Sequence, residues 1–235
     1  MHASLKFIRN CLGLRSRWGA FTTQAISLKL VLEDESLMLP PGHIEYTWGA
    51  LDLLQRKAGL FEDADYRVAA LAALLPDLID KPLSLLIFTD SKTSQGLAHT
   101  LLIHLLVSLI VLVRWRKGFV YALAFNGHLL ADRIWLYPRT LFFPFLGWQF
   151  EPWRFMGSPE AMLDAYAEIV AYPLIITLES IGLVILAWLV VTYQLYRWKN
   201  LMAFLVSGRL LQTGERSEEK IRIEHGGRTH EDHCR

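Results

Sequence analysis

The segment from Leu174 to Val191 constrains this chain more than any other feature of its sequence. It reads LIITLESIGLVILAWLVV, and Glu179 is its only ionisable residue. An apolar helix needs about 20 residues to cross the hydrocarbon core of a bilayer. Pro173 precedes the segment, and Arg197 and Lys199 follow it, as expected for a helix that ends at a charged membrane surface. The sequence therefore predicts a membrane-spanning helix here.

Shorter apolar runs precede this segment and predict further embedded helices. Leu97–Val113 and Phe119–Ile134 flank the basic cluster Arg114–Lys117, a pattern typical of a helical hairpin with a basic turn. Two weaker helical runs lie earlier, at Ile44–Leu54 and Val68–Leu75. We therefore predict an all-α fold, a polytopic membrane helical bundle with about four or five embedded helices. Because these runs fall short of about 20 residues, a soluble all-helical protein with very apolar core helices is the alternative.

The polarity of the chain changes near both ends, which indicates three parts. We expect a basic N-terminal extension over residues 1–41, disordered or not translated if Met38 is the true start. A membrane-embedded domain follows over residues 42–200, and a charged tail over residues 201–235. The first thirty residues contain no continuous apolar segment before a small-residue cleavage site, so we expect no cleavable signal peptide.

Composition excludes several classes of function. The chain has 24 basic and 23 acidic residues, so it has no basic excess with which to bind a nucleic-acid backbone, and no nucleic-acid partner is expected. Cys11 and Cys234 lie near opposite ends, which leaves neither a disulfide framework nor a cysteine metal site. Any metal ion must therefore be bound by His and carboxylate ligands.

A set of His and carboxylate residues interrupts the apolar runs. Ionisable side chains in apolar helices are costly and generally face a bundle interior or a water-filled cavity, so each indicates a functional site. His128 and Asp132 are four residues apart, a spacing that places both side chains on one helix face, where they can share one ion. His104 is five residues beyond His99 and is expected to be an ordinary packed histidine. The other residues suited to bind a divalent ion are His43, Asp77, Asp80, His99 and Glu179.

The basic residues predict where these groups lie. If Arg56 and Lys57, the Arg114–Lys117 cluster, and the Arg197 region all face the cytoplasm, successive helices alternate in direction. Each candidate ligand then falls near the non-cytoplasmic face, where the groups would form one composite site. In this arrangement Asp77 and Asp80 follow a helix that ends at Pro76. The alternative is that these two acids only cap that helix end.

Four segments, taken in order, carry a resemblance to a known family. They are Gly42-His43, LLPDLIDKP over residues 74–82, QGLAHTLL over residues 95–102, and GHLLAD over residues 127–132. They resemble the membrane-bound metal-dependent hydrolase family, also described as LexA-binding, inner-membrane-associated hydrolases. Its members typically have a His near the N-terminus, a PDxD-like segment, an RGxTHS-like segment and a late HxxxD. The order of ligands is more distantly similar to the zinc-dependent phospholipase C group.

The resemblance implies a metal-dependent hydrolase in the inner (plasma) membrane. A divalent ion, Zn²⁺ in the first place and Mn²⁺ or Fe²⁺ as alternatives, would activate a water for attack on a phosphoester or ester of a lipid-like substrate. Asp80 would be a bridging ligand or the base that takes the proton of the water, and Glu179 would either support the ligands from outside or complete the ligand set. The metal ligands implied are His43, Asp77, Asp80, His99, His128 and Asp132.

Departures from the family pattern leave other functions open. The two acids of the PDxD-like segment are one residue further apart here, Ser94-Gln95 stands where the family often has His-Arg, and Ala98 stands where it has Thr. One alternative is a non-catalytic membrane protein with a structural or vestigial metal site that binds a regulatory protein partner. Another is an ion or proton pathway. The aromatic stretch Trp135–Trp153 is expected to lie at the membrane interface.

Overall fold

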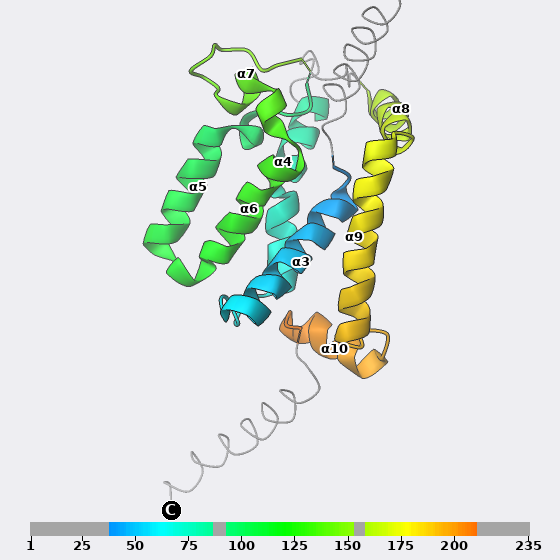
Figure 1. The fold of residues 1–235 in the computed structure, drawn as a ribbon. Coiled ribbons are helices and arrows are strands. Elements are labelled where there is room, and N and C mark those ends of the chain that lie inside the picture. Colours follow the sequence, from blue (N-terminus) through cyan, green and yellow to red (C-terminus); the bar gives the residue numbers. More distant parts are fainter. Residues whose placement is uncertain (1–37, 87–92, 153–157, 211–235) are drawn as a thin grey trace, which may run out of the picture. The chain divides into compact units, whose positions relative to one another are not determined.

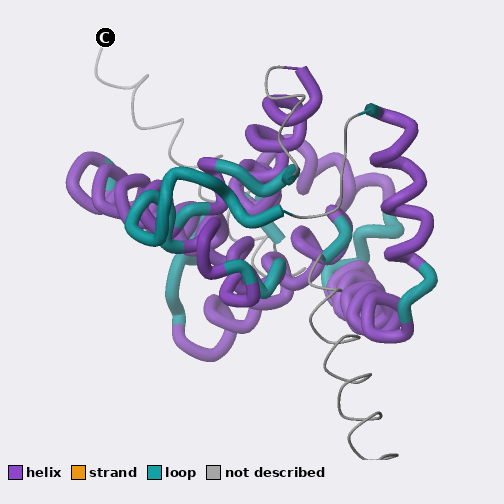
Figure 2. The backbone as a smooth tube through the Cα atoms, turned by 90° about the horizontal axis from the view of Figure 1, so that it is seen from above, coloured by secondary structure: helices purple, strands orange, loops and turns teal. Residues whose placement is uncertain are grey.

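The structure is a computed structural model that describes residues 38–86, 93–152 and 158–210. These ranges are helical, and no strand occurs within them, which confirms the predicted all-α class (Figures 1 and 2). The α-helices are α3 (Pro40–Ala58), α4 (Tyr66–Leu86), α5 (Leu101–Arg114), α6 (Phe119–Ala131), α7 (Pro138–Leu141), α8 (Pro159–Val170), α9 (Pro173–Thr192) and α10 (Trp198–Ser207). The 3₁₀ turns are η1 (Leu97–His99), η2 (Arg116–Gly118) and η3 (Ile134–Leu136). The segments 1–37 and 211–235, with most of the basic extension and of the charged tail, lie outside the described residues.

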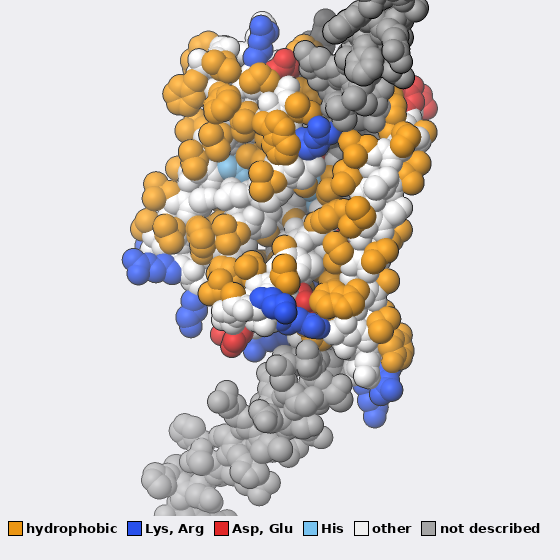
Figure 3. Space-filling model, in the orientation of Figure 1, with side chains coloured by type: hydrophobic (Ala, Val, Ile, Leu, Met, Phe, Trp, Pro, Cys, Tyr) orange, Lys and Arg blue, Asp and Glu red, His pale blue; other side chains and the backbone are white. Residues whose placement is uncertain are grey.

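Helix α4 lies at the centre of the bundle. It packs against both α3 and α6, while α9 packs on α3 and α5 packs on α6. The helices α3, α4, α5, α6 and α9 run alternately up and down (Figure 1). As a result, the basic residues at the C-terminal end of α3, in the α5–α6 turn and after α9 lie at one end of the bundle, where Figure 3 shows lysine and arginine side chains.

The ends of the helices have clear local causes. Pro40 and Pro41 occupy the first turn of α3. Backbone N–H groups in a first turn have no acceptor within the helix, so the missing N–H of proline costs no helical hydrogen bond there. Gly59 ends α3 in the left-handed conformation, and its N–H reaches back to Gln55 O. Thr100 interrupts the predicted run Leu97–Val113 and caps α5, because its side chain accepts a hydrogen bond from the N–H of Ile103.

The prediction that a helix ends at Pro76 is wrong. Helix α4 continues through Pro76 and Pro82 to Leu86, so Asp77 and Asp80 lie within it. Each proline removes one backbone donor and strains the preceding turn, but tertiary packing of α4 against two neighbouring helices holds the helix together. Three residues apart on one helix, the two acids lie close to the same face, which places both near the interior of the bundle.

Helix α9 matches the predicted membrane-spanning segment. Its 20 residues include a window with a mean hydropathy of 2.5, of which 17% is buried within the protein. A core helix of a soluble protein would be mostly buried, so this helix presents most of its apolar surface outward. Among the described residues α9 is the one helix both long and apolar enough to cross a bilayer, while α5 is apolar but shorter.

Polar contacts fix the basic end of the bundle. Tyr193, just after α9, donates a hydrogen bond to the fully buried Asp52 of α3, whose other oxygen lies 3.3 Å from Arg56 Nε. The guanidinium of Arg56 also lies 4.8 Å from the ring centroid of Trp188. Helix α10 continues past residue 200, where we expected the tail to begin, and its buried Phe204 packs edge-on against Trp48.

Candidate metal centre

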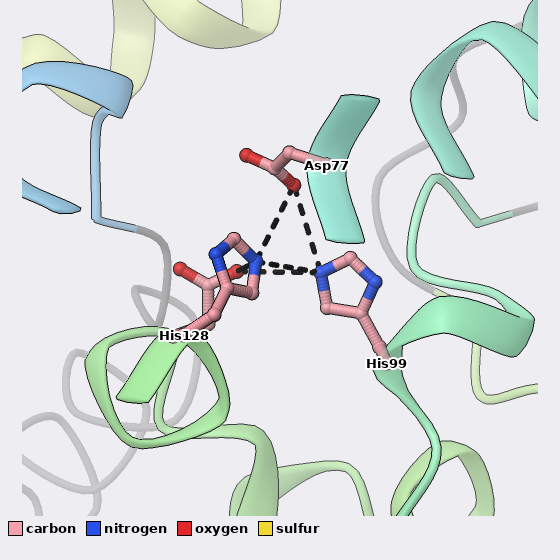
Figure 4. Close-up of side chains that lie close together, drawn as sticks. Asp77, His99 and His128 are labelled. Atoms are coloured by element: carbon pink, nitrogen blue, oxygen red, sulfur yellow. Dashed lines mark hydrogen bonds and ion pairs between the residues drawn. The ribbon is translucent and has the colours of Figure 1, made fainter. Parts of the chain in front are cut away.

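Four buried side chains from three elements meet in the interior of the bundle. Asp77 comes from the middle of α4, His99 from η1, His128 from the last turn of α6, and Asp132 directly follows α6. Their exposed fractions are 5%, 0%, 1% and 0%, and one ligand atom from each lies within 4.8 Å of the others. Figure 4 shows Asp77, His99 and His128 pointing toward one another.

The distances within this group fit a small divalent ion. His99 Nε2 lies 3.6 Å from Asp77 Oδ1 and 3.5 Å from Asp132 Oδ2. The corresponding distances from His128 Nε2 are 3.7 and 3.3 Å, and the two Nε2 atoms are 3.1 Å apart. Four atoms bound tetrahedrally at about 2.0–2.1 Å from a zinc ion lie about 3.3 Å from one another. Five of the six distances among the four atoms therefore lie close to the tetrahedral spacing, and the sixth, between Asp77 Oδ1 and Asp132 Oδ2, is no more than 4.8 Å.

The outer nitrogens of both histidines bind acceptors. His99 Nδ1 lies 2.7 Å from Asp80 Oδ2, and His128 Nδ1 lies 2.8 Å from the carbonyl oxygen of Ala73. A carboxylate and a carbonyl can only accept, so in the neutral rings each Nδ1 carries the proton and each Nε2 presents a lone pair to the centre. This arrangement, with an oxygen acceptor behind each ligating histidine, is the usual one at metal sites.

The two carboxylates are also held from outside, each through the oxygen that faces away from the centre. Asp77 forms an ion pair with Lys81 through Oδ2, and Asp132 Oδ1 accepts a hydrogen bond from the N–H of Met38 at 3.3 Å. The inward atoms Asp77 Oδ1 and Asp132 Oδ2 have no hydrogen-bond partner among the described residues. With both rings neutral and protonated at Nδ1, four acceptor atoms converge in a buried space, which is costly unless a cation lies there.

The charges around the centre also fit a divalent ion. Asp77 and Asp132 together neutralise a double positive charge, and the charge of Asp80 offsets that of Lys81. Mixed imidazole and carboxylate ligands suit zinc, manganese or iron. The residues present therefore fit the divalent cation that the sequence predicts, and the group could bind such an ion.

The other predicted site residues lie around this group of four. The His43 ring stacks on the His128 ring at 4.2 Å, and its Nε2 lies 3.2 Å from Asp132 Oδ1. Asp80 accepts hydrogen bonds from the N–H groups of Gly96 and Ala98 in addition to contacting His99. Glu179 on α9 accepts a hydrogen bond from the N–H of Leu39 at 3.0 Å, beside the start of α3.

The extra residue in the PDLID segment has a structural explanation. Because Asp77 and Asp80 are three apart on α4, one carboxylate faces the centre while the other lies behind His99.

Ser94 and Gln95, which replace the His-Arg pair, are both buried, and the Gln95 amide makes no hydrogen bond within the described residues.

Sequence reasoning missed three groups that support the centre. Lys81 could have been found, since it lies four residues beyond Asp77 on a helix, the spacing of an intrahelical ion pair. The Ala73 carbonyl and the Met38 N–H are backbone groups and leave no signal in the residue types. His104 lies outside the group and bonds instead to Asn126 and to the Ala98 carbonyl.

Comparison with known proteins identifies the family. The model of one family, described as YdjM inner membrane protein, matches residues 38–204, and the chain belongs to this family. The match agrees with the predicted inner-membrane location. Its description names no activity, so the hydrolase part of the resemblance, and the similarity to phospholipase C, gain no support from it. Searches for similar curated proteins and for similar solved structures gave no match.

Proposed function

We propose that this member of the YdjM inner membrane family is an integral membrane, metal-dependent hydrolase. The observation that carries the proposal is the convergence of four buried potential ligand atoms, one each from Asp77, His99, His128 and Asp132, two of which are carboxylate oxygens with no hydrogen-bond partner among the described residues. The expected ion is Zn²⁺, with Mn²⁺ or Fe²⁺ as alternatives. The expected substrate is a phosphoester or ester of a lipid-like molecule.

The chemistry would be that of a metal-activated water. A divalent ion at such a centre lowers the pKa of a bound water to about 7 and polarises a phosphoryl or acyl oxygen. Asp80 has three N–H groups directed at its carboxylate, which favours the orientation of His99 over a role as ligand or base. Glu179 binds the backbone at the start of α3, which favours a role in fixing the segment that carries His43.

The proposed membrane arrangement embeds α3, α4, α5, α6 and α9. Large apolar side chains on the outer surface of α5 support this arrangement, with Leu105, Leu109 and Val113 more than half exposed. His43, His99 and Asp132 lie at the ends of α3, α5 and α6 that are opposite to the basic residues. By the positive-inside tendency, the centre would then lie nearer the non-cytoplasmic face.

A non-catalytic protein with a structural ion is the second candidate. Asp77, His99, His128 and Asp132 would supply four protein ligands, whereas catalytic zinc sites typically have three and keep one position for water. An enzyme would need a coordination position for water, either a fifth one or one vacated by a carboxylate. A structural site would not need such a position.

Metal content tests the centre that both candidates share. We expect the full-length protein, purified in detergent and offered zinc, manganese and iron, to hold close to one equivalent of a divalent ion by elemental mass spectrometry. The double variant His128→Ala/Asp132→Ala should lose it. His104→Gln, a buried histidine outside the group, is the matched control, and circular dichroism and gel filtration check folding. A wild type without metal, or equal metal in the double variant, would remove this mechanism.

Activity then separates the two candidates. The metal-loaded wild type is assayed on bis(p-nitrophenyl) phosphate, a soluble phosphodiester, and on phospholipid in mixed micelles. Hydrolysis of either substrate that disappears in the double variant supports the enzyme. A metal-loaded wild type that hydrolyses neither favours the structural ion.

A further inference from the structure

An apolar cavity leads away from the centre between α3 and α6. It has a volume of about 230 Å³. One face of α3 and one face of α6 form its walls, and Ala69 of α4 lies at its floor. His43 and His128 line it too, and these two stacked rings belong to the wall of the metal centre. The cavity is therefore polar where it meets the centre, carries Tyr46 and Thr47 on the next turn of α3, and is otherwise apolar.

The length of this cavity matches one leaflet of a membrane. On α3 its lining extends from His43 to Leu54, which is about 16 Å at the helical rise of about 1.5 Å per residue. The hydrocarbon core of a bilayer is about 30 Å thick, so this is about half of it. On α6 the lining extends from Ala131 to Val120, over the same number of residues in the opposite direction.

The cavity opens on an apolar surface. Leu54 of α3 and Leu123 of α6 are among its lining residues and are 37% and 40% exposed. Hydrophobic side chains are spread over the face shown in Figure 3, and most of its lysine and arginine side chains lie toward the lower end. A molecule in this cavity contacts mainly apolar side chains before it reaches the two histidines.

We propose that this cavity binds one acyl chain of a membrane phospholipid and places its phosphoester at the metal centre. The inference rests on the proposed hydrolase function for its chemistry, because the polar end of the ligand is then the group that reacts. In the hydrolysis, the oxygen of a water forms a bond to phosphorus and a phosphorus–oxygen ester bond breaks. The departing alcohol oxygen takes a proton from that water, so the products are an alcohol and a phosphate monoester.

Gly127 offers a way to fill the cavity without strain. It lines the cavity from α6, and a Cβ atom added to it would meet no described atom within 4 Å. A larger side chain at this position would extend into the space assigned to the chain. At Gly49, by contrast, an added Cβ would lie 2.6 Å from Ile185 Cγ2, so substitution there would disturb helix packing instead.

The first experiment measures lipid binding independently of catalysis. Native mass spectrometry of the full-length protein should detect bound dioleoyl phosphatidylglycerol in the wild type, and bound lipid should fall several-fold in Gly127→Leu. Leu130→Trp, an exposed position on the same helix but outside the cavity, is the matched control and should retain the lipid. Equal lipid retention by Gly127→Leu and the wild type would overturn the proposal, as would equal loss in both variants.

The second experiment relates the cavity to the reaction. The ratio of kcat/KM on long-chain phospholipid to kcat/KM on bis(p-nitrophenyl) phosphate should fall about tenfold in Gly127→Leu, since the lost contacts serve only the chain. Metal content is measured in the same samples, so damage to the centre is recognised. An unchanged ratio would contradict chain binding in the cavity. A wild type that binds lipid through the cavity but hydrolyses neither substrate would instead contradict the proposed function alone.

Discussion

In both histidines of the candidate centre, the two ring nitrogens have different roles. Each Nδ1 donates to a fixed acceptor, Asp80 or the Ala73 carbonyl, and each Nε2 faces the space between the carboxylates. The acceptors therefore determine both the tautomer and the ring orientation. The orientation of the two Nε2 atoms therefore depends on groups that lie outside the candidate metal centre.

Asp80 allows this dependence to be measured. We expect Asp80→Asn to weaken zinc affinity by about 10- to 100-fold, because the substitution removes the negative charge behind His99. The measurement is competition with a chromophoric chelator in detergent. Asp63→Asn, at a side chain that is 84% exposed, serves as the control. Equal affinities in wild type and Asp80→Asn would show that His99 needs no carboxylate behind it.

For individual residues, the sequence predicted which side chains belong to the site better than it predicted what each of them does there. The HxxxD spacing brought His128 and Asp132 together, and the order of the motifs added Asp77 and His99. The spacing did not show which of Asp77 and Asp80 faces the centre, since that depends on the rotation of α4. The Met38 N–H could not be found, because any residue type supplies one.

The elements show how packing overrides local signals. Pro76 and Pro82 indicate helix breaks, yet α4 continues through both because it packs against α3 and α6. The apolar runs located α5, α6 and α9, since their composition alone defines them. Helix α10 carries no comparable run, and its placement follows from the contact of Phe204 with Trp48, which is distant in sequence.

The start of α4 carries a pH-dependent contribution to stability. Asp65 accepts hydrogen bonds from the N–H groups of Arg67 and Val68, and the Arg67 guanidinium beside it holds the pKa of Asp65 below its ordinary value. A lowered pKa means that the folded state favours the carboxylate. The stabilisation is therefore complete above the ordinary pKa and is lost as the pH falls through the lowered value.

Asp65→Ala tests this cap. We expect a loss of about 1 kcal/mol in the free energy of unfolding at neutral pH, and a shrinking difference from wild type as the pH falls below the ordinary aspartate pKa of about 3.9. Thermal unfolding in detergent followed by circular dichroism measures both. The exposed Asp63→Ala is the control. A difference that persists unchanged in acid would exclude the carboxylate as its source.

At the scale of the whole molecule, the basic clusters and the candidate metal ligands lie toward opposite ends of the bundle. Most basic side chains visible in Figure 3 lie toward one end, and three of the site residues lie at the opposite ends of their helices. The sequence predicted this separation from the alternation of runs and basic clusters. It did not predict the cavity between α3 and α6, because the distance between two helices that rest on a third is not encoded in either pattern.

The orientation of the bundle follows from this separation. In a variant without Cys11 and Cys234, single cysteines at Lys117 and at Trp148 should be labelled by an impermeant reagent from opposite sides of the membrane, Lys117 from the cytoplasm. Trp148 is 82% exposed and follows the centre in the chain. Intact cells and inverted vesicles give the two readings. Labelling of both positions from the same side would reject the arrangement.

The four residues of the centre all lie between positions 77 and 132, ahead of α9 in the chain. Synthesis proceeds from the N-terminus, so every ligand leaves the ribosome before the most apolar helix does. An ion bound at that stage would join α4, η1 and α6 while the last long helix is still being made. The centre would then be assembled before α9 packs against α3.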